Sequence, residues 1–267
     1  MVWAISGGAG FLGLHLARRL LADGHEVRSL DLVGLDDSQL EGQVRELRGD
    51  IRDQTAAREL VQGARILVHA AAALPIRGSR AEIESVNVDG TLTLLSAAAE
   101  AGVRRVVFVS STAVYGVPDK HPIEEDDPLH GVGHYGESKI EAEDAVRAFM
   151  RRGLDCVILN PTVIIGPGDL NQIPSSVILE LARGNVPPTI PPGGVTLIDV
   201  RDVADAHGAA AERGRTGERY LLGAVDRLLA GVFGTDRGLP EVHLGRLALL
   251  DPRSGDVTFV EGALRGA

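Results

Sequence analysis

The sequence predicts an α/β protein built on a doubly wound parallel sheet, and two observations carry that prediction. Apolar runs of strand length alternate with stretches whose apolar residues recur at helical spacing. The first apolar run, 2–5, leads through a glycine-rich turn into the first helical stretch, 11–22. Strands and helices that alternate through right-handed crossovers form a parallel sheet covered by helices. Ligands of such sheets bind at the carboxyl ends of the strands.

The turn after the first strand carries three glycines, Gly7, Gly10 and Gly13, at a spacing of three. In a dinucleotide-binding turn the first glycine permits the tight turn and the second lets the backbone approach a pyrophosphate. The third lets the helix lie close to the sheet. The helix that starts with Phe11 and Leu12 offers free N–H groups and the positive end of its dipole to an anion. We therefore expect these five residues to hold the phosphates of a dinucleotide.

The second predicted strand, 26–31, ends in Asp31, eighteen residues after Gly13. An acidic side chain there can accept hydrogen bonds from the adenosine ribose, and its charge repels a 2′-phosphate. Asp31 therefore favours NAD over NADP. Arg28 and Arg45 are nearby cations that could hold a 2′-phosphate instead.

Composition and charge narrow the class of protein. The chain has 267 residues, 44% of them apolar and 3% aromatic, which is enough for one large domain with an aliphatic core. Its net charge of −10, without a basic block, argues against partners such as nucleic acid or an anionic membrane surface. Cys156 is the only cysteine, which fits a reducing cytoplasm and a small buried side chain. No stretch reads as a signal peptide or a membrane span.

The remaining elements continue the alternation, and the composition then changes at Gly166. We expect strands at 2–5, 26–31, 45–47, 65–71, 104–110, 154–159, 196–200 and 219–222, and helices at 11–22, 53–62, 80–101, 135–152, 173–183 and 202–212. After Gly166, glycine- and proline-rich stretches interrupt the pattern. The expected organisation is a dinucleotide-binding domain at 1–165, a substrate-side segment at 166–195, a return to the first domain at 196–223, and a shortened substrate-binding tail at 224–267.

Small or polar residues follow three of the predicted strands. They are Asp50 and Ile51 after the third strand, Ala70, Ala71 and Ala72 after the fourth, and Ser110, Ser111 and Thr112 after the fifth. The Asp50 carboxylate can accept from an adenine amino group. The alanines leave room for a nucleotide at the edge of the sheet where ligands bind.

The helix after the fifth strand opens with Tyr135 and Lys139, which project from one face because they are four residues apart. Tyrosine, with a pKa near 10, is a weak base at neutral pH. A neighbouring ammonium and a positively charged nicotinamide favour the phenolate and lower that pKa. Tyr135 can then take a proton from a substrate hydroxyl, Ser111 can bond the same oxygen, and Lys139 can hold the nicotinamide ribose. No metal site is expected, since His130 and His134 lie in a loop-like stretch without a third ligand.

With these residues in place, the chain from residue 1 to about 223 resembles an extended short-chain dehydrogenase/reductase. The resembled branch is that of NAD-dependent epimerases and dehydratases and of 3β-hydroxysteroid dehydrogenases. The motifs that carry the resemblance are 7–13, Asp31, Asp50-Ile51, 87–91, 109–116, 135–139, 161–167 and 202–204. The resemblance implies a Rossmann fold and NAD(P), with Ser111, Tyr135 and Lys139 catalytic. It also implies that Asn87, Pro161 and Val163 lie at the cofactor, with 70–72 beside it.

Two departures from the family pattern narrow the reaction. Sugar-nucleotide dehydratases of this family usually carry Thr-Asp-Glu where this chain has 112–114, Thr-Ala-Val, so dehydration is disfavoured. Many sugar epimerases carry an asparagine where Val163 stands, which weakens the case for a nucleotide sugar. The 162–167 stretch resembles the steroid-dehydrogenase and dihydroflavonol-reductase side. Asn160 replaces a usual arginine.

The sequence therefore predicts an NAD-dependent oxidoreductase or epimerase that moves hydride between nicotinamide and a secondary alcohol or ketone. An epimerase, including one for sugar nucleotides, and a dehydrogenase or reductase share this machinery. A non-catalytic NAD(P)-binding protein is the third possibility, and the intact Ser111, Tyr135 and Lys139 argue against it. The resemblance further implies a homodimer formed by the two long helices, 80–101 and 135–152. The expected location is the cytoplasm.

Overall fold

In a computed structural model, the described residues are 1–75, 78–117, 122–169, 194–228, 247–250 and 257–260. The chain divides into two compact units. The first contains residues 1–160 and 204–220, and the second contains 161–203 and 221–267. We describe each unit by itself.

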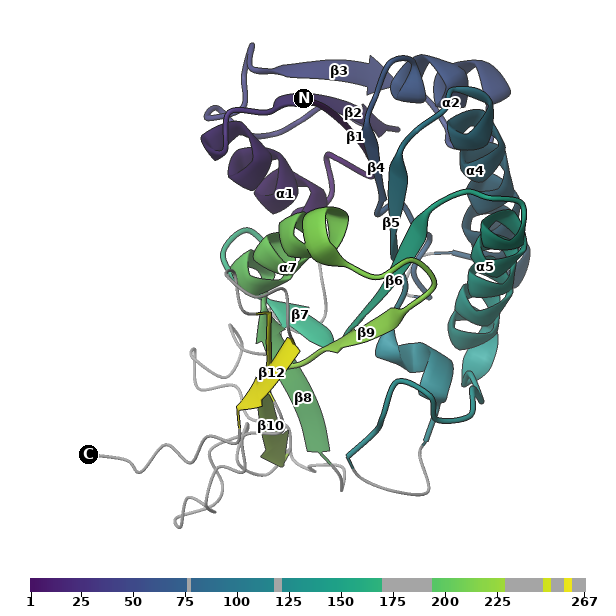
Figure 1. The fold of residues 1–267 in the computed structure, drawn as a ribbon, viewed down its shortest axis with the longest axis vertical. Helices are drawn as coiled ribbons and strands as arrows, with labels where there is room; N and C mark the ends of the chain where they lie inside the picture. The colour runs from purple at the N-terminus through teal and green to yellow at the C-terminus, as the bar shows by residue number, and fades with distance from the viewer. Residues whose placement is uncertain (76–77, 118–121, 170–193, 229–246, 251–256, 261–267) are drawn as a thin grey trace. The chain divides into compact units, whose positions relative to one another are not determined.

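The main sheet has seven strands in the order β3-β2-β1-β4-β5-β6-β9 (Figure 1). Its strands are β1 (Val2–Ser6), β2 (Glu26–Asp31), β3 (Val44–Arg48), β4 (Ile66–His69), β5 (Arg105–Val109), β6 (Cys156–Pro161) and β9 (Arg219–Leu222). The strands from β3 to β6 pair in parallel, with registers such as Ala4 with Leu67. The order reverses between β1 and β4, and ligands bind at such switch points. The predicted doubly wound sheet is confirmed.

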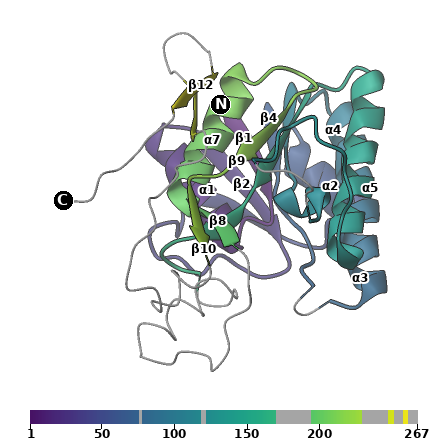
Figure 2. The same ribbon diagram turned by 90° about the horizontal axis from the view of Figure 1, so that it is seen from below.

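Helices cover both faces of this sheet, as Figures 1 and 2 show. On one face lies α1 (Phe11–Ala22), with α7 (Val200–Arg213), and on the other lie α2 (Gln54–Val61), α4 (Gly90–Glu100) and α5 (Gly133–Arg151). The core beneath α2, α4 and α5 is mostly aliphatic, with Phe108 from β5 and Phe149 from α5, and it includes the one cysteine, Cys156. Burial raises the pKa of the Cys156 thiol to about 12. The prediction that Cys156 is a small buried side chain is therefore confirmed.

The helix expected at 80–101 is divided into three parts. A short helix, α3 (Arg80–Glu84), runs into a π-helical turn at Ser85–Asp89 and then into α4. A Cβ on Gly90 would lie 2.5 Å from the Ile51 Cδ1 atom, so α4 starts where only glycine fits against that side chain. π-turns of this kind often lie at functional sites.

The second unit holds a separate three-stranded sheet in the order β10-β8-β7. Its strands are β7 (Val163–Ile165), β8 (Gly194–Asp199) and β10 (Val225–Leu228), and a further pair is formed by β11 (Leu247–Leu250) and β12 (Val257–Val260). The strand expected at 196–200 exists, but its place in the first domain is a wrong prediction, because β8 pairs with β7 and β10. The chain returns to the first unit at Ala204, and the helix expected at 173–183 lies outside the described residues. Among the helices described, none is both long and apolar enough to cross a membrane.

Candidate active site

The glycine turn has the geometry that a dinucleotide turn requires. Gly7 has a φ of +77°, and a Cβ there would lie 2.6 Å from the Ala71 backbone nitrogen. A Cβ on Gly13 would lie 2.2 Å from the Gly7 carbonyl oxygen, so the helix packs directly on the turn. A Cβ on Gly10 would meet only that same oxygen, at 3.2 Å. The turn is therefore tight, close to the β4 end, and open at its middle glycine.

The start of α1 has the features of a helix terminus that can receive an anion. Gly10 is the N-cap and offers no side-chain cap, and the first turn contains no acidic residue. The N–H groups there keep their hydrogen-bonding capacity, and the helix dipole favours an anion in front of them. Phe11 and Leu12 are partly exposed at this end. The residues present therefore fit a pyrophosphate.

Asp31 lies at the end of β2, next to the glycine turn. Its Oδ2 accepts from the Ala9 N–H at 3.1 Å, and its Oδ1 accepts from Val33 at 3.4 Å. Each oxygen keeps a second lone pair for a ribose hydroxyl. Arg28 donates to the Gln62 carbonyl, and Arg45 pairs with Glu59 at 3.0 Å. Both arginines that could hold a 2′-phosphate are thus engaged elsewhere.

Asp50 and Ile51 differ in which of their atoms are available to contact a cofactor. Arg52 bonds both oxygens of Asp50, and these bonds lower the pKa of that carboxyl. The contact between Asp50 and an adenine amino group stays a prediction. The carboxylate that would make this contact is already paired with Arg52. Ile51 is 5% exposed, which leaves only its backbone for a cofactor.

The loop after β4 is fixed by two polar contacts. The Asn87 amide accepts from Ala73 N–H at 2.8 Å and donates to the Ala73 carbonyl and to Ser138 Oγ. This side chain therefore positions the loop, and its direct contact with a cofactor stays a prediction. The Ala71 N–H donates to Ser6 Oγ at 3.4 Å. The segment 70–72 thus lies against the glycine turn, as the close approach of Gly7 also requires.

His69 is a residue whose role the sequence left unassigned. Its Nδ1 shares a hydrogen bond of 2.8 Å with Ser6 Oγ, and its Nε2 shares one of 2.9 Å with Thr91 Oγ1. Complete burial and the charge of Lys139 lower its pKa to about 3. The neutral ring therefore joins β1, β4 and α4 behind the loop. A histidine at the end of a buried strand was the available signal.

The structure brings Ser111 and Tyr135 together. Ser111 caps the short 3₁₀ turn at Thr112–Tyr115 and accepts from the Ala113 N–H at 3.1 Å. Tyr135 lies in the first turn of α5, near enough to Ser111 for the serine side chain to act on the pKa of the Tyr135 phenol. Two hydroxyls from different elements therefore converge at the carboxyl end of β5, where a substrate oxygen could bond both.

Lys139 lies one turn further along α5 and is buried. Its Nζ donates to the Val109 carbonyl at 2.7 Å and lies 4.6 Å from the centre of the Phe108 ring. Burial lowers its pKa to about 8, and the charge of Glu143 acts in the opposite direction. The pKa of Tyr135 is raised by burial, and the Ser111 side chain opposes that rise. In the protein alone the ammonium of Lys139 is turned to the Val109 carbonyl, and the pKa lowering expected of the ammonium together with a bound nicotinamide stays a prediction.

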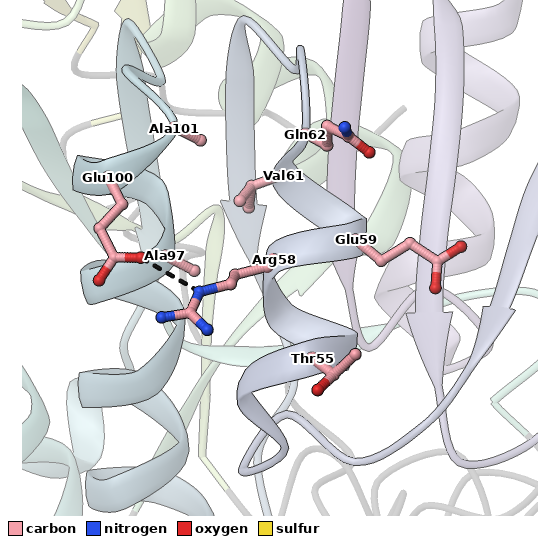
Figure 3. Close-up of a pocket in the computed structure, with 8 residues that line it drawn as sticks. All are labelled: Thr55, Arg58, Glu59, Val61, Gln62, Ala97, Glu100 and Ala101. Carbon is pink, nitrogen blue, oxygen red and sulfur yellow. Dashed lines mark hydrogen bonds and ion pairs between the residues drawn. The ribbon is translucent and has the colours of Figure 1, made fainter.

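Pro161 ends β6, and Val163 starts β7. Both belong to the second unit, so their expected place at the cofactor stays a prediction. A groove between α2 and α4 also lies in the first unit (Figure 3). Its lining includes the ion pair of Arg58 and Glu100 and no residue of the candidate site.

Fold and site together define a Rossmann-fold enzyme of the extended short-chain dehydrogenase/reductase class. The chain belongs to the NAD dependent epimerase/dehydratase family, whose sequence model matches residues 3–223. The resemblance seen in the motifs is thereby confirmed, as is the enzyme class with NAD as its cofactor.

Relatives of known name differ in their reactions. The chain is 36% identical to "Sterol demethylase protein B" of Methylococcus capsulatus, over 83% of this chain and 69% of that protein. It is 35% identical to a "Putative dihydroflavonol 4-reductase" of Synechocystis, over 88% and 72%. It is 30% identical to the UDP-glucose 4-epimerase of Bacillus subtilis, over 80% and 73%.

Solved structures agree with the fold. The dTDP-glucose 4,6-dehydratase DesIV of Streptomyces venezuelae, with NAD and DAU bound, aligns with a TM-score of 0.80 and 28% identity. That alignment covers 88% of this chain and 79% of DesIV. MoeE5, in complex with UDP-glucose and NAD, aligns with a TM-score of 0.76 and 30% identity over 86% and 79%.

Proposed function

We propose that this enzyme is an NAD-dependent dehydrogenase or reductase of a secondary alcohol or ketone. The observation that carries the proposal is the approach of two side-chain hydroxyls, those of Ser111 and Tyr135, with the buried Lys139 one turn away. Bound NAD supplies the acceptor or donor of hydride in this reaction. The glycine turn and the start of α1 hold its phosphates, and Asp31 receives its adenosine ribose.

Tyr135 is the acid and base of the proposed reaction. Because burial raises its pKa, the phenol keeps its proton at neutral pH and can donate it to the oxygen of a ketone. In the direction of oxidation, Tyr135 must first lose this proton, so that direction is favoured by alkaline pH. Ser111 donates to the same substrate oxygen and stabilises the charge that develops there. Lys139 holds the nicotinamide ribose.

Two features support a substrate without a nucleotide diphosphate. The stretch after the serines, 112–114, lacks the acids of sugar dehydratases, and Val163 stands where many sugar epimerases have an asparagine. The two relatives named above at 35% identity or more are a sterol protein and a putative dihydroflavonol reductase. The proposed substrate class is therefore a hydroxyl- or keto-bearing ring system, with Ser111 and Tyr135 at the reacting carbon.

A sugar-nucleotide epimerase is the second candidate. It is favoured by the likeness to MoeE5, which was solved with UDP-glucose, and by the similarity to UDP-glucose 4-epimerase. An epimerase oxidises and then reduces the same carbon, so the cofactor is regenerated within each turnover. The same three residues serve both reactions, and the fate of the cofactor separates them.

The test begins with the protein as purified. It is unfolded, and any released nucleotide is identified by mass and quantified by absorbance. An empty site that binds added NAD reversibly supports the dehydrogenase or reductase, and a panel of cyclic alcohols and ketones then identifies the substrate by NADH absorbance. Nearly one NAD per chain supports the epimerase, to be assayed with UDP-glucose and UDP-galactose. A protein that neither contains nor binds NAD would refute both candidates.

We also propose a cytoplasmic homodimer in which the helical segment 80–100 and α5 form the contact. The support is the resemblance to family members whose equivalent helices pair. Sedimentation equilibrium of the full chain tests it, and a mass of 28.1 kDa, that of one chain, would exclude the dimer.

A further inference from the structure

A carboxylate without access to solvent lies one helical turn beyond Lys139. Glu143 is 0% exposed, and on α5 it continues the face that Tyr135 and Lys139 occupy. A buried charge costs several kcal/mol unless it is paired and hydrogen-bonded. The reaction as proposed above gives Glu143 no role, so its partners are informative.

Three donors hold Glu143. The guanidinium of Arg219, on β9, forms an ion pair with its Oε2 atom. Ser110 Oγ donates to its Oε1 at 2.6 Å, and Asn160 Nδ2 donates to the same atom at 2.9 Å. Both carboxylate oxygens of Glu143 therefore have hydrogen-bond donors inside the protein. Segments far apart in sequence therefore meet at this one side chain.

Arg219 is itself held in place. Its side chain is 8% exposed, and it donates to the Glu125 carbonyl at 2.9 Å. Its guanidinium also lies 5.7 Å from the centre of the Tyr115 ring. The Tyr115 hydroxyl donates to the same Glu125 carbonyl at 3.1 Å. The cation is thus fixed beside Glu143 rather than free to move into solvent.

The cluster reaches the candidate catalytic residues by two routes. Asn160 Nδ2 also donates to the Ser111 carbonyl at 3.0 Å, so the backbone of the serine is bonded to the partner of Glu143. The second route is electrostatic, because the negative charge of Glu143 favours the ammonium form of Lys139.

We propose that Glu143 and Arg219 are positioning residues of the reaction. Glu143 keeps Lys139 in its ammonium form and, through Asn160, holds the backbone of Ser111. Arg219 forms a buried ion pair with Glu143 and holds its carboxylate in place. The proposal rests on the functions given above to Ser111 and Lys139.

Among the groups around Lys139, Glu143 is the one whose negative charge stabilises the ammonium form. From β5, the Val109 carbonyl and the Phe108 ring face the ammonium, and both favour the charge. From β4, His69 is neutral at physiological pH. On α5, Tyr135 stays protonated at neutral pH and Glu143 carries the negative charge. Without that charge, the burial of Lys139 is opposed only by these weaker contacts, and its pKa falls further.

The test observes Lys139 directly and needs neither substrate nor NAD. The chain contains two lysines, Lys120 and Lys139, so ¹³C labelling at lysine Cε yields two NMR signals, which the Lys120→Arg variant assigns. In the full-length wild type we expect Lys139 to titrate near pH 8. In Glu143→Gln its pKa should fall by at least about one unit. In Arg219→Gln, where the carboxylate remains, it should not fall.

Two further variants keep the test decisive. Glu143→Gln leaves Arg219 buried without a counter-charge and can fail to fold. The double variant Glu143→Gln/Arg219→Gln removes both charges and should show the same fall. Glu141→Gln removes an exposed carboxylate from the same helix and should change nothing. An unchanged Lys139 in the folded Glu143 variants, or an equal fall in Arg219→Gln, would overturn the proposal.

A second readout separates this inference from the proposed function. NAD binding by calorimetry between pH 6 and 9 should weaken as Lys139 loses its proton, and in Glu143→Gln the loss should begin at lower pH. At pH 8 about half of the wild-type Lys139 and about one tenth of the variant's would carry the proton, so the dissociation constant of the variant should be about fivefold higher. If the pKa of Lys139 falls in Glu143→Gln but NAD affinity keeps the pH dependence of the wild type, Lys139 does not hold the nicotinamide ribose. The electrostatic coupling between Glu143 and Lys139 would still be supported.

Discussion

Replacing Gly7 by alanine tests whether the turn after β1 is the dinucleotide site. Gly7 has a φ of +77°, a conformation that costs an alanine about 1–2 kcal/mol. The new Cβ would also lie 2.6 Å from the Ala71 nitrogen and 2.8 Å from its Cα, and backbone cannot rotate away as a side chain can. Overpacking of this kind costs a further 1–3 kcal/mol, roughly. The expected loss of stability is therefore about 2–5 kcal/mol.

Gly24 supplies a matched control. Its φ is +75°, and a Cβ there would meet nothing within 4 Å. Gly24→Ala should therefore show only the conformational cost of about 1–2 kcal/mol and should bind NAD as the wild type does. Gly7→Ala should lose at least about tenfold in NAD affinity, since the turn and the 70–72 loop must separate.

The two measurements are urea unfolding for stability and calorimetric titration for NAD. Both variants are compared with the wild type at the same pH and salt. If Gly7→Ala loses no more stability than Gly24→Ala and binds NAD with unchanged affinity, the reasoning about this turn is refuted.

Three further predictions concern the acid and base, the cofactor and a buried histidine. Tyr135→Phe should lower the turnover of an identified substrate by about 10²–10⁴-fold and leave the NAD dissociation constant unchanged. Full activity of this variant in steady-state assays would show that Tyr135 is not the acid and base. In calorimetric titrations the wild type should bind NAD more tightly than NADP. Asp31→Asn should narrow that preference, because the repulsion between the carboxylate and a 2′-phosphate is lost. Tighter binding of NADP than of NAD by the wild type would contradict the function given to Asp31. His69 has a pKa of about 3 in the folded protein and an ordinary value of 6.5, so the unfolded chain binds more protons between these values and stability should fall as pH is lowered from 6.5. Urea unfolding between pH 7 and 4.5 should show a shallower fall for His69→Gln, and equal slopes would mean that the ring is not held neutral.

The features that the sequence determined by itself are local ones. A strand, a glycine-rich turn and a helix follow one another within residues 2–22, and their chemistry depends on neighbours in the chain. The same holds for Tyr135 and Lys139, whose spacing on one helix places them on one face. These patterns predicted the doubly wound sheet, and together with the family resemblance they indicated the class of enzyme.

Other features were decided by the tertiary structure. Glu143 and Arg219 are 76 residues apart, and no local pattern pairs them. Their contact exists because β9 joins the main sheet beside β6, which brings its arginine to the buried face of α5.

The sheet that β8 joins and the pKa of Lys139 both depend on contacts between distant segments. A strand sequence specifies an extended segment and leaves its partner open, so β8 could be predicted as a strand but not assigned to the second sheet. The pKa of Lys139 depends on its burial and on Glu143, and both depend on how α5 packs against β5. The sequence determined which residues carry the chemistry, whereas long-range packing decided which charges surround them, because burial and ion pairing arise only when distant segments meet.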